Sequence, residues 1–316
     1  SAVILDLSGA MIGDASLNRS GNIMSHDTLI AEAQDVLDRA VAAAGLDRSQ
    51  LSSVGLGIPG IVDNAGGTVL WSPLLIDRDV NLRESFARAT GIPVEIDNDA
   101  NLVALAELWF GAGRARSDFA VVTIEHGVGM GLVLDHNLYR GAKGMGMELG
   151  HTTVRLDGAL CRCGKRGCLE SEAAEPAIVR DVLATVGRLV PPEEMAAAAD
   201  DDERVAAILR RAGQLVGTAV GSAMTLLDPR RVVVSGEGVR LGHHYIDGIR
   251  EGIPASLLPE VEIDLVFEPW GDEAWARGAA SLVLRELFTP AYLRGERHPA
   301  GSRSTSRGEP SSIAAT

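Results

Sequence analysis

The sequence predicts an α/β fold of two similar halves with a cleft between them. Strand and helix patterns alternate along the 316 residues, and the pattern that opens the chain recurs near residue 119. Each half begins with two strands joined by a glycine-containing turn, and helices follow. Hydrophobic residues make up 46% of the chain, enough for a large buried core. Because ligand sites form preferentially between such halves, the cleft is the expected functional region.

The first half, residues 1–110, opens with a pair of strands that alternate apolar and polar residues, VILDL and AMIGDASL, joined by Ser8-Gly9. Later helices are predicted where apolar residues recur at helical spacing, and strands where short apolar runs lie between turns. In chain order these are the helix DTLIAEAQDVLDRAVAAAGL, the strands SSVGLGIPGIVD and TVLW, the helix NLRESFARATG, the strand VEID and the helix NDANLVALAELWFGAG.

The second half, residues 111–271, repeats the opening with the strand FAVVTIE, a glycine-rich turn HGVGMG and the strand LVLDHNLY. After a cysteine-containing segment come the helices EPAIVRDVLATVG and DERVAAILRRAGQLVGTAVGSAMTLL, the strand RRVVVSGEG, a helix and the strand VEIDLVFEP. The closing helix, about residues 272–288, is expected to return and pack on the first half. Residues 289–316 are rich in Pro, Gly, Ser and Arg, which predicts a disordered tail.

Composition excludes several classes of function. The net charge is −14, whereas a surface that binds duplex DNA has to neutralise phosphates with Lys and Arg, so these residues are not expected to bind nucleic acid directly. No apolar run is long enough to span a bilayer, and the start SAVILDLSG lacks the basic and apolar regions of a signal peptide. No membrane partner is expected, and the predicted location is the cytoplasm.

All three cysteines lie in one short segment, HTTVRLDGALCRCGKRGCLESE, residues 151–172. An odd number of clustered cysteines is a poor disulfide framework and a good metal framework. Cys161, Cys163 and Cys168, with His151 ten residues before the first, form the Cys3His set of a closed tetrahedral Zn²⁺ site, whose role would be structural. The interleaved glycines let the loop turn tightly. The alternative is a cluster of free, partly buried cysteines, which packing alone seldom produces.

Several segments, in order, resemble the ROK family of bacterial sugar kinases and sugar-responsive transcriptional repressors. The resemblance runs from the first residues to about residue 288 and is carried by GLGIPGIVD, DNDANLVALAE, HGVGMGLVLDHNLYRGAKGMGMELGH, CRCGKRGCLE and VVVSGEG. It implies an actin-like or ribonuclease H-like fold of two duplicated domains, a sugar pocket in the cleft between them, and a homodimer or homotetramer.

The resemblance also implies which residues would surround the sugar. They are Gly60 through its backbone, Asn98, Asp99, Glu148, His151 and Glu170. Carboxylates and an amide suit a ring of hydroxyls, each of which both donates and accepts a hydrogen bond. In a kinase, Asp99 would be the general base that takes the proton of the sugar hydroxyl. His151 would share its ring between zinc and ligand, with one nitrogen on each.

These residues also have simpler structural explanations. Asn98 or Asp99 could cap the helix that follows, which would account for one of the two. Glu148 could lie in solvent, and Glu170 could be an acidic residue in the first turn of a helix. For the set, tied together by the cysteine loop, the sugar pocket is the favoured interpretation.

Three departures from the kinase pattern favour a sugar sensor. The family's kinases open with a strand that ends in Asp-x-Gly-Gly-Thr, and nothing like it precedes VILDLSG, which suggests a fragment because an inner strand would otherwise be missing. Glu125 and His126 stand where the kinases have Gly-Thr ahead of the glycines Gly127 and Gly129, and a carboxylate there repels a triphosphate. The segment Ser235-Gly236-Glu237-Gly238 replaces the Gly-Gly pair that lies near adenosine in the kinases.

A further departure lies on the sugar side, where Leu74 occupies the position of an asparagine in the family. One hydrogen bond to the sugar would be lost, so the bound sugar or its affinity would differ.

The predicted function is therefore the sugar-binding effector and oligomerisation portion of a ROK-family transcriptional regulator, stabilised by structural Zn²⁺. ATP and Mg²⁺ are not expected as cofactors, and DNA is expected to bind only through an upstream winged helix-turn-helix that these residues do not contain. The alternative is an ATP-dependent hexose or amino-sugar kinase with Asp99 as general base. A sugar-binding protein with neither activity is a third possibility.

Overall fold

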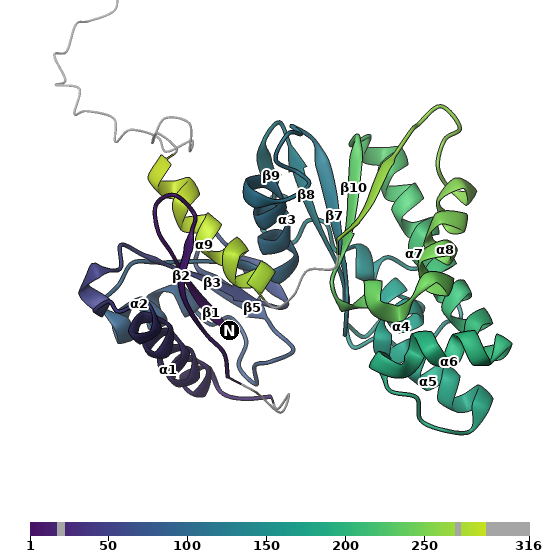
Figure 1. Ribbon diagram of the computed structural model, residues 1–316, viewed down its shortest axis with the longest axis horizontal. Coiled ribbons are helices and arrows are strands. Elements are labelled where there is room, and N and C mark those ends of the chain that lie inside the picture. Colours follow the sequence, from purple (N-terminus) through teal and green to yellow (C-terminus); the bar gives the residue numbers. More distant parts are fainter. Residues whose placement is uncertain (18–22, 269–272, 289–316) are drawn as a thin grey trace, which may run out of the picture.

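The computed structural model describes residues 1–17, 23–268 and 273–288, and it consists of two α/β halves side by side (Figure 1). The predicted tail at residues 289–316 lies outside the described residues. None of the helices in the described part of the chain is long and apolar enough to cross a lipid bilayer.

The first half contains three two-stranded sheets, in which β1 pairs antiparallel with β2, β3 parallel with β6, and β4 antiparallel with β5. The elements are β1 (Ala2–Leu5), β2 (Met11–Ala15), α1 (His26–Ala43), η1 (Arg48–Gln50), β3 (Val54–Ile58), β4 (Ile61–Asp63), β5 (Thr68–Trp71), α2 (Leu82–Thr90), β6 (Val94–Asn98) and α3 (Asp99–Phe110). Ser25 caps α1 by accepting the Thr28 N–H, and Gly91, at φ +73°, ends α2.

The second half is built on one five-stranded sheet of order β11-β10-β7-β8-β9. Its elements are β7 (Phe119–Ile124), β8 (Val128–Leu134), β9 (Asn137–Tyr139), η2 (Leu149–His151), α4 (Leu169–Ala173), α5 (Glu175–Val186), η3 (Pro192–Glu194), α6 (Met195–Asp201), α7 (Glu203–Leu227), β10 (Arg231–Ser235), η4 (Glu237–Leu241), α8 (His243–Gly252), η5 (Ile253–Ala255) and β11 (Asp264–Glu268). The last described helix, α9 (Glu273–Phe288), follows β11 in the chain and returns to the first half. Strand β7 is central and every one of its residues is buried, as expected for a strand covered on both faces.

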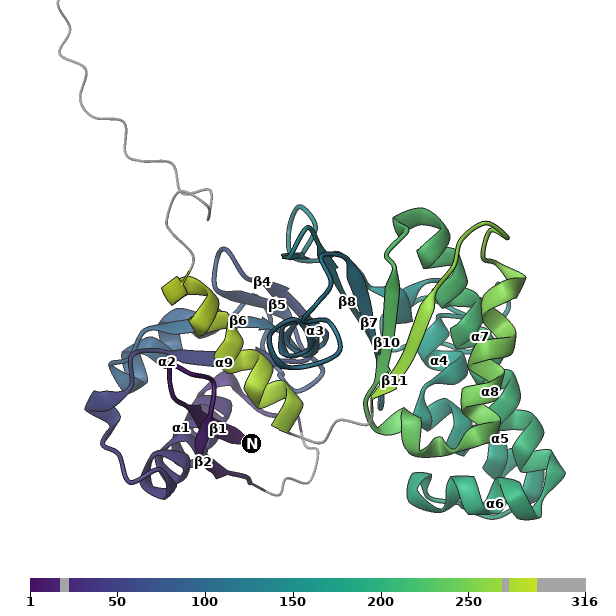
Figure 2. The same ribbon diagram turned by 45° about the horizontal axis from the view of Figure 1, so that its top comes forward.

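Helix α3 lies between the two halves, seen end-on in Figure 2. It approaches β8 closely, because a Cβ on Gly131 would lie only 2.6 Å from the Cβ of Ala104. Helix α9 packs against α3 and β3, where a Cβ on Gly55 would lie 1.7 Å from the carbonyl oxygen of Ala279. The described end of the chain therefore lies against the first half.

The structure corrects three details of the expected elements. Gly129 and Gly131, predicted as part of a turn, lie inside β8, where the absence of a side chain admits α3. The segment GIVD forms a strand of its own, β4, which pairs with β5 instead of extending β3. Residues 192–201 form η3 and α6, which the apolar pattern did not predict because four successive alanines carry little helical periodicity.

Candidate functional site

The four residues predicted to bind metal lie together. The ligand atoms of His151, Cys161, Cys163 and Cys168 are all within 4.8 Å of one another. Cys163 Sγ and Cys168 Sγ are 3.6 Å apart, and Cys161 Sγ lies 3.6 Å from His151 Nδ1. The three cysteines are free thiols rather than disulfide partners. The cysteines are thus clustered as predicted, and both a metal site and a cluster of free, partly buried cysteines are consistent with this arrangement.

Hydrogen bonds within the loop aim the sulfurs at one point. The Cys161 N–H donates to Lys165 O at 2.8 Å, and the Gly164 N–H donates to Cys161 O at 2.9 Å. Gly167 has φ +67°, and a Cβ there would lie 1.5 Å from the carbonyl oxygen of Arg155, so this turn requires glycine. Cys168 is the residue immediately before α4, which links the loop to the helix that carries Glu170.

The donor set and its spacing fit zinc. Sulfur ligands about 2.3 Å from a tetrahedral zinc ion lie about 3.8 Å apart, close to the measured 3.6 Å between Cys163 and Cys168. Burial and the neighbouring thiols raise the pKa of Cys168 to about 12, so this sulfur stays a thiol unless a cation binds it. Three sulfurs and one imidazole could thus hold zinc in a closed site, with no coordination position left for substrate.

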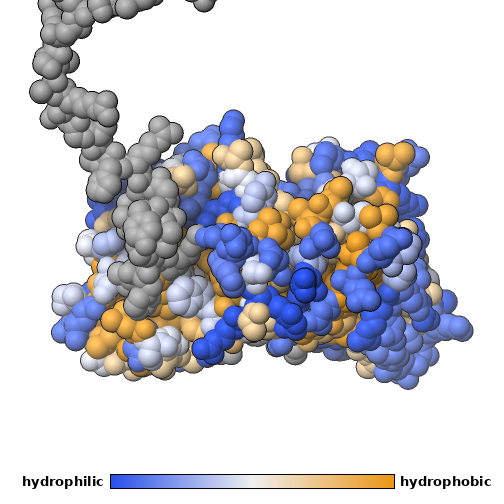
Figure 3. All heavy atoms as spheres, turned by 90° about the horizontal axis from the view of Figure 1, so that it is seen from above, coloured by the Kyte–Doolittle hydropathy of each residue, from blue (hydrophilic) through white to orange (hydrophobic). Residues whose placement is uncertain are grey.

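A pocket of about 310 Å³ lies where the halves meet, and the surface is notched along this junction in Figure 3. It is lined by the ends of strands and helices from both halves: Gly57, Pro59, Asp99, Glu125, Glu237 and Trp275. Three of these carry carboxyl groups, so the pocket is acidic in composition. The cleft predicted from the duplicated pattern is therefore present, and it is acidic.

Asn98 and Asp99 lie at the junction between β6 and α3. Asn98 caps α3, because its Oδ1 accepts the N–H of Ala100 at 2.9 Å, and its Nδ2 donates to Gly60 O at 2.7 Å. The capping explanation is thus correct for Asn98, and the same side chain fixes the Gly60 turn. Asp99 is the first residue of α3, and burial raises the pKa of its carboxyl while the Ala100 N–H and Arg162 lower it.

Glu148 lies near Asp99 and Glu170, and Glu170 lies near His151. Glu148 is exposed to solvent, and partial desolvation of its carboxyl group, with the charges of Asp99 and Glu170, raises its pKa to about 7. Glu170 is buried in the first turn of α4, and its two oxygens accept hydrogen bonds from Arg162 at 2.7 and 2.9 Å. Since His151 Nδ1 faces the sulfur of Cys161, its Nε2 is the nitrogen left for a ligand.

The turn between β7 and β8 carries the residues that depart from the kinase pattern. The Glu125 N–H donates to Gly127 O at 2.8 Å, which closes the turn, and His126 is exposed at its tip. Glu125 Oε1 is buried without a hydrogen-bond partner among the described residues. Burial, together with the charges of Asp99 and Glu237, raises the pKa of Glu125 to about 8.

Replacing Glu125 with glutamine is expected to change how stability depends on pH. The folded protein keeps a proton on Glu125 up to about pH 8, whereas the unfolded chain releases it near 4.5, so the free energy of unfolding falls as pH rises between these values. Glu125→Gln removes this dependence and should be more stable than the natural chain at about pH 8. Melting temperatures between about pH 5 and about pH 8 test this, with the exposed Glu260→Gln as control. Parallel pH profiles for all three proteins would contradict it.

Sequence reasoning missed Arg162, which stands between the first two cysteines. Its guanidinium pairs with Glu170 and lies 5.9 Å from the centre of the Trp71 ring. It also lowers the pKa of Asp99 and Glu148, so it is the cation that offsets this group of carboxylates. The sequence does show an arginine inside the cysteine motif, but which residues its side chain contacts depends on how the loop folds.

The buried pair of Asp97 and Arg140 was also missed. Asp97 Oδ2 accepts from Arg140 Nη2 at 2.6 Å and from its Nε at 2.7 Å, and Asp97 Oδ1 accepts from Asn101 and from the Asn98 N–H, both at 2.8 Å. The pair joins β6 of the first half to the residue that follows β9 of the second half. It therefore holds the start of α3, with Asn98 and Asp99, against the second half.

Comparison with known proteins decides the family. The model of the ROK family matches residues 2–286. The chain belongs to the ROK family. Family membership and the actin-like α/β fold, both predicted from the sequence, are confirmed.

ROK relatives include kinases and repressors. The glucokinase of Thermotoga maritima is 31% identical over 90% of this chain and 97% of its own length. The xylose repressor of Caldicellulosiruptor bescii is 32% identical over 82% of this chain and 69% of its own length. Both classes of function are therefore present among relatives at similar identity.

Solved ROK structures also include both classes. A ROK family transcriptional regulator described as a homologue of the E. coli MLC protein superposes with a TM-score of 0.80 at 27% identity, over 90% of this chain and 74% of the regulator. A ROK glucokinase from Streptomyces griseus, in complex with glucose and AMPPNP, has a TM-score of 0.75 at 26% identity, over 89% of this chain and 94% of the kinase. Overall similarity does not distinguish a kinase from a regulator, so the distinction has to be argued from the residues of the site.

Proposed function

We propose that this chain is the sugar-binding effector and oligomerisation portion of a transcriptional regulator, and that it does not phosphorylate the sugar. The observation that carries the proposal is Glu125. Its buried carboxylate lies in the pocket with Asp99 and Glu237, at the turn where the kinase pattern has Gly-Thr to hold phosphate. The Glu125 side chain stands where the kinase pattern has a small turn with a hydroxyl for phosphate, and a triphosphate beside it would have to displace this side chain from an acidic pocket.

The proposed sugar ligands are the residues around Asp99. Asp99, Glu148 and His151 Nε2 would supply acceptors and a donor to the sugar, while Asn98, which donates to Gly60 O, would hold that turn beside them. Each sugar hydroxyl can both donate and accept a hydrogen bond, and polar groups of this kind provide a partner for each role. Zn²⁺ on His151 Nδ1 and the three cysteines would fix the His151 ring and the start of α4, so the metal supports the pocket and takes no part in chemistry.

The same proposal assigns DNA contact to a separate domain, because the charge of −14 disfavours direct binding of DNA here. The domain limits proposed are residues 1–110 with α9 and residues 111–271. Sugar binding in the cleft would favour a closed arrangement of these domains, in a homodimer or homotetramer, and thereby reorient the attached domain.

A second candidate function is an ATP-dependent sugar kinase with Asp99 as general base. Two observations favour it: burial raises the pKa of Asp99, as suits a base, and the similarity to the Thermotoga maritima glucokinase spans 97% of that enzyme. A kinase would have to bind the phosphates beside Glu125, and this is the point on which the two candidates differ.

Sugar-dependent release of ADP, measured over a panel of hexoses, pentoses and amino sugars, separates the candidates. We expect no turnover above the rate without sugar. At least one sugar should raise the melting temperature, since a ligand at about 100 times its Kd adds about 2.7 kcal/mol to the free energy of unfolding. Asp99→Asn should abolish this stabilisation, while Asp14→Asn, an exposed residue on β2, should retain it. Turnover that is lost in Asp99→Asn would overturn the sensor proposal in favour of the kinase.

A further inference from the structure

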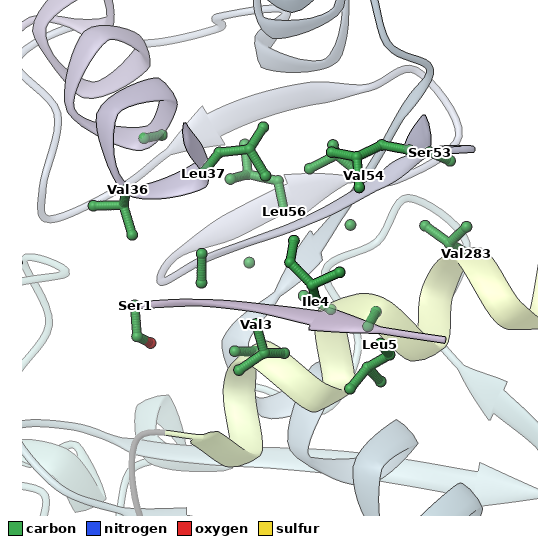
Figure 4. A pocket seen from close by; sticks show the side chains of 18 of the residues that line it. Ser1, Val3, Ile4, Leu5, Val36, Leu37, Ser53, Val54, Leu56 and Val283 are labelled. Carbon is green, nitrogen blue, oxygen red and sulfur yellow. The ribbon is translucent and has the colours of Figure 1, made fainter. Parts of the chain in front are cut away.

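A second group of possible metal ligands lies outside the cysteine loop. Among the described residues, Asp200, His243 and His244 form a further set whose ligand atoms all lie within 4.8 Å of one another. Asp200 belongs to α6, and the two histidines are the first residues of α8. The described side chains that line a groove of about 790 Å³ between β1 and β3 form no such set, and those labelled in Figure 4 are nearly all aliphatic. The set on α6 and α8 is therefore the second place where the described residues could bind an ion.

The carboxylate of Asp200 is close to one nitrogen of each ring. Asp200 Oδ1 lies 3.7 Å from His243 Nδ1 and 3.5 Å from His244 Nε2, and the ring centroids are 4.0 Å apart. A hydrogen bond between such groups is usually about 2.7–3.2 Å long. Two ligand atoms that each lie about 2.1 Å from a tetrahedral ion are about 3.4 Å apart. The measured spacing therefore suits a shared ion better than direct hydrogen bonds.

The backbone that carries these three side chains is fixed by buried contacts. Ala199, next to Asp200 in α6, is buried. Gly242, which precedes the histidines, packs so closely on α6 that a Cβ there would lie 2.8 Å from the Cβ of Ala196. Tyr245, which follows the histidines, is fully buried. The positions of the ligands are thus set by the core, so an ion would have to order only their side chains.

Exposure and charge at this point both suit a cation. The side chains of His243 and Asp200 are 65% and 58% exposed, which leaves room for water on a bound ion. Asp201 is exposed beside Asp200, and the chain carries a net charge of −14. A simpler alternative is that Asp200 only offsets the positive end of the α8 dipole. That alternative accounts for the carboxylate but gives no role to the two imidazoles.

We propose that Asp200, His243 and His244 bind a divalent transition-metal ion, which ties the end of α6 to the start of α8. Two imidazoles and one carboxylate suit Zn²⁺, Ni²⁺, Co²⁺ or Cu²⁺, whereas Mg²⁺ and Ca²⁺ prefer oxygen ligands alone. With three protein ligands, the ion keeps at least one position open to water or an added ligand, unlike a closed site of four. The inference depends neither on the proposed sugar function nor on zinc at the cysteines, because neither site uses these ligands.

Calorimetric titration of Ni²⁺ into the full chain without an affinity tag tests the site. The single variants His243→Gln, His244→Gln and Asp200→Asn each remove one ligand. His136→Asn is the matched control, because it removes an exposed histidine elsewhere and asparagine tolerates the left-handed backbone there, φ +60°. We expect one Ni²⁺ to bind the natural chain and the control, and to bind each ligand variant at least about tenfold more weakly. Ni²⁺ bound by the cysteine loop would be the same in all five proteins, and Mg²⁺ should not bind at these three residues.

Hydrogen exchange locates the ion. Ni²⁺ should slow amide exchange at both Met195–Asp201 and His243–Gly252 in the natural chain, and it should not do so in His243→Gln. If Asp200 only offsets the dipole of α8, Asp200→Asn will bind Ni²⁺ as tightly as the natural chain. Weaker binding in all three ligand variants, together with slowed exchange in both helices, supports the proposal. Unchanged affinity in any ligand variant, or unchanged exchange in either helix of the natural chain, overturns it.

Discussion

Replacing Cys163 with serine is expected to remove zinc from the protein and to lower the free energy of unfolding by about 2–5 kcal/mol. The side chain is exposed, so without a bound metal the loss of one sulfur would change stability by only about 0.5 kcal/mol. With zinc bound, the same substitution breaks a closed coordination shell whose binding energy contributes to folding. The size of the effect therefore reports directly on the metal.

The measurements are zinc per chain by elemental analysis and stability by denaturant unfolding. Leu169→Ala is the matched control, because it removes a fully buried side chain next to Cys168 and should cost about 2–5 kcal/mol while zinc stays bound. Sugar affinity should fall at least about tenfold in Cys163→Ser, since His151 loses the metal that orients its ring. Purified natural protein without zinc, or a Cys163→Ser variant of unchanged stability, would disprove the metal site.

The grouping of His151 with the three cysteines could be predicted because its signal is local. Cys161 and Cys163 are two residues apart and Cys168 follows after five more, so a single glycine-containing loop determines their geometry. The position of His151 depends on the short η2 turn that precedes the loop. Residue spacing is therefore sufficient to predict a cluster whose members all come from one short segment of the chain.

The acidic pocket could be predicted only in part. Glu125 stood out because it departs from a family pattern, but its neighbours Glu237 and Trp275 come from elements far apart in the sequence. Nothing in the local pattern says that residues of η4 and α9 line the same pocket as Glu125. Arg162 was missed for the same reason, since its partner Glu170 is reached only after the loop folds back on α4.

Glycines were the main source of error in the predicted elements. The run HGVGMG was interpreted as a turn because glycine is uncommon inside strands. In the structure Gly129 and Gly131 belong to β8, and their missing side chains allow α3 to approach the sheet. The reason for each glycine is a tertiary contact with Ala100 or Ala104, which no window of sequence contains.

Replacing Arg140 with methionine is expected to destabilise the protein by about 3–5 kcal/mol, because Asp97 would be left as a buried carboxylate without its counter-ion. The Asp97 side chain is 1% exposed, whereas Arg88 and Glu84 on α2 form an ion pair with side chains 72% and 65% exposed. Arg88→Met is therefore the matched control and should change stability by about 0.5 kcal/mol or less. Equal effects of the two substitutions, measured by denaturant unfolding, would refute the prediction.

The double variant Arg140→Met with Asp97→Asn tests whether the loss comes from the uncompensated charge. Neutralising Asp97 should recover part of the lost stability, which a double-mutant cycle reports as coupling between the two residues. The pair also links the start of α3 to the second half, since Asp97 accepts hydrogen bonds from Asn98 and Arg140 at once. Sugar affinity should therefore remain reduced in the double variant even where stability recovers, because Asn98 and Asp99 are no longer held against the other half. Recovery of both together would mean that the pair stabilises the fold without positioning the pocket.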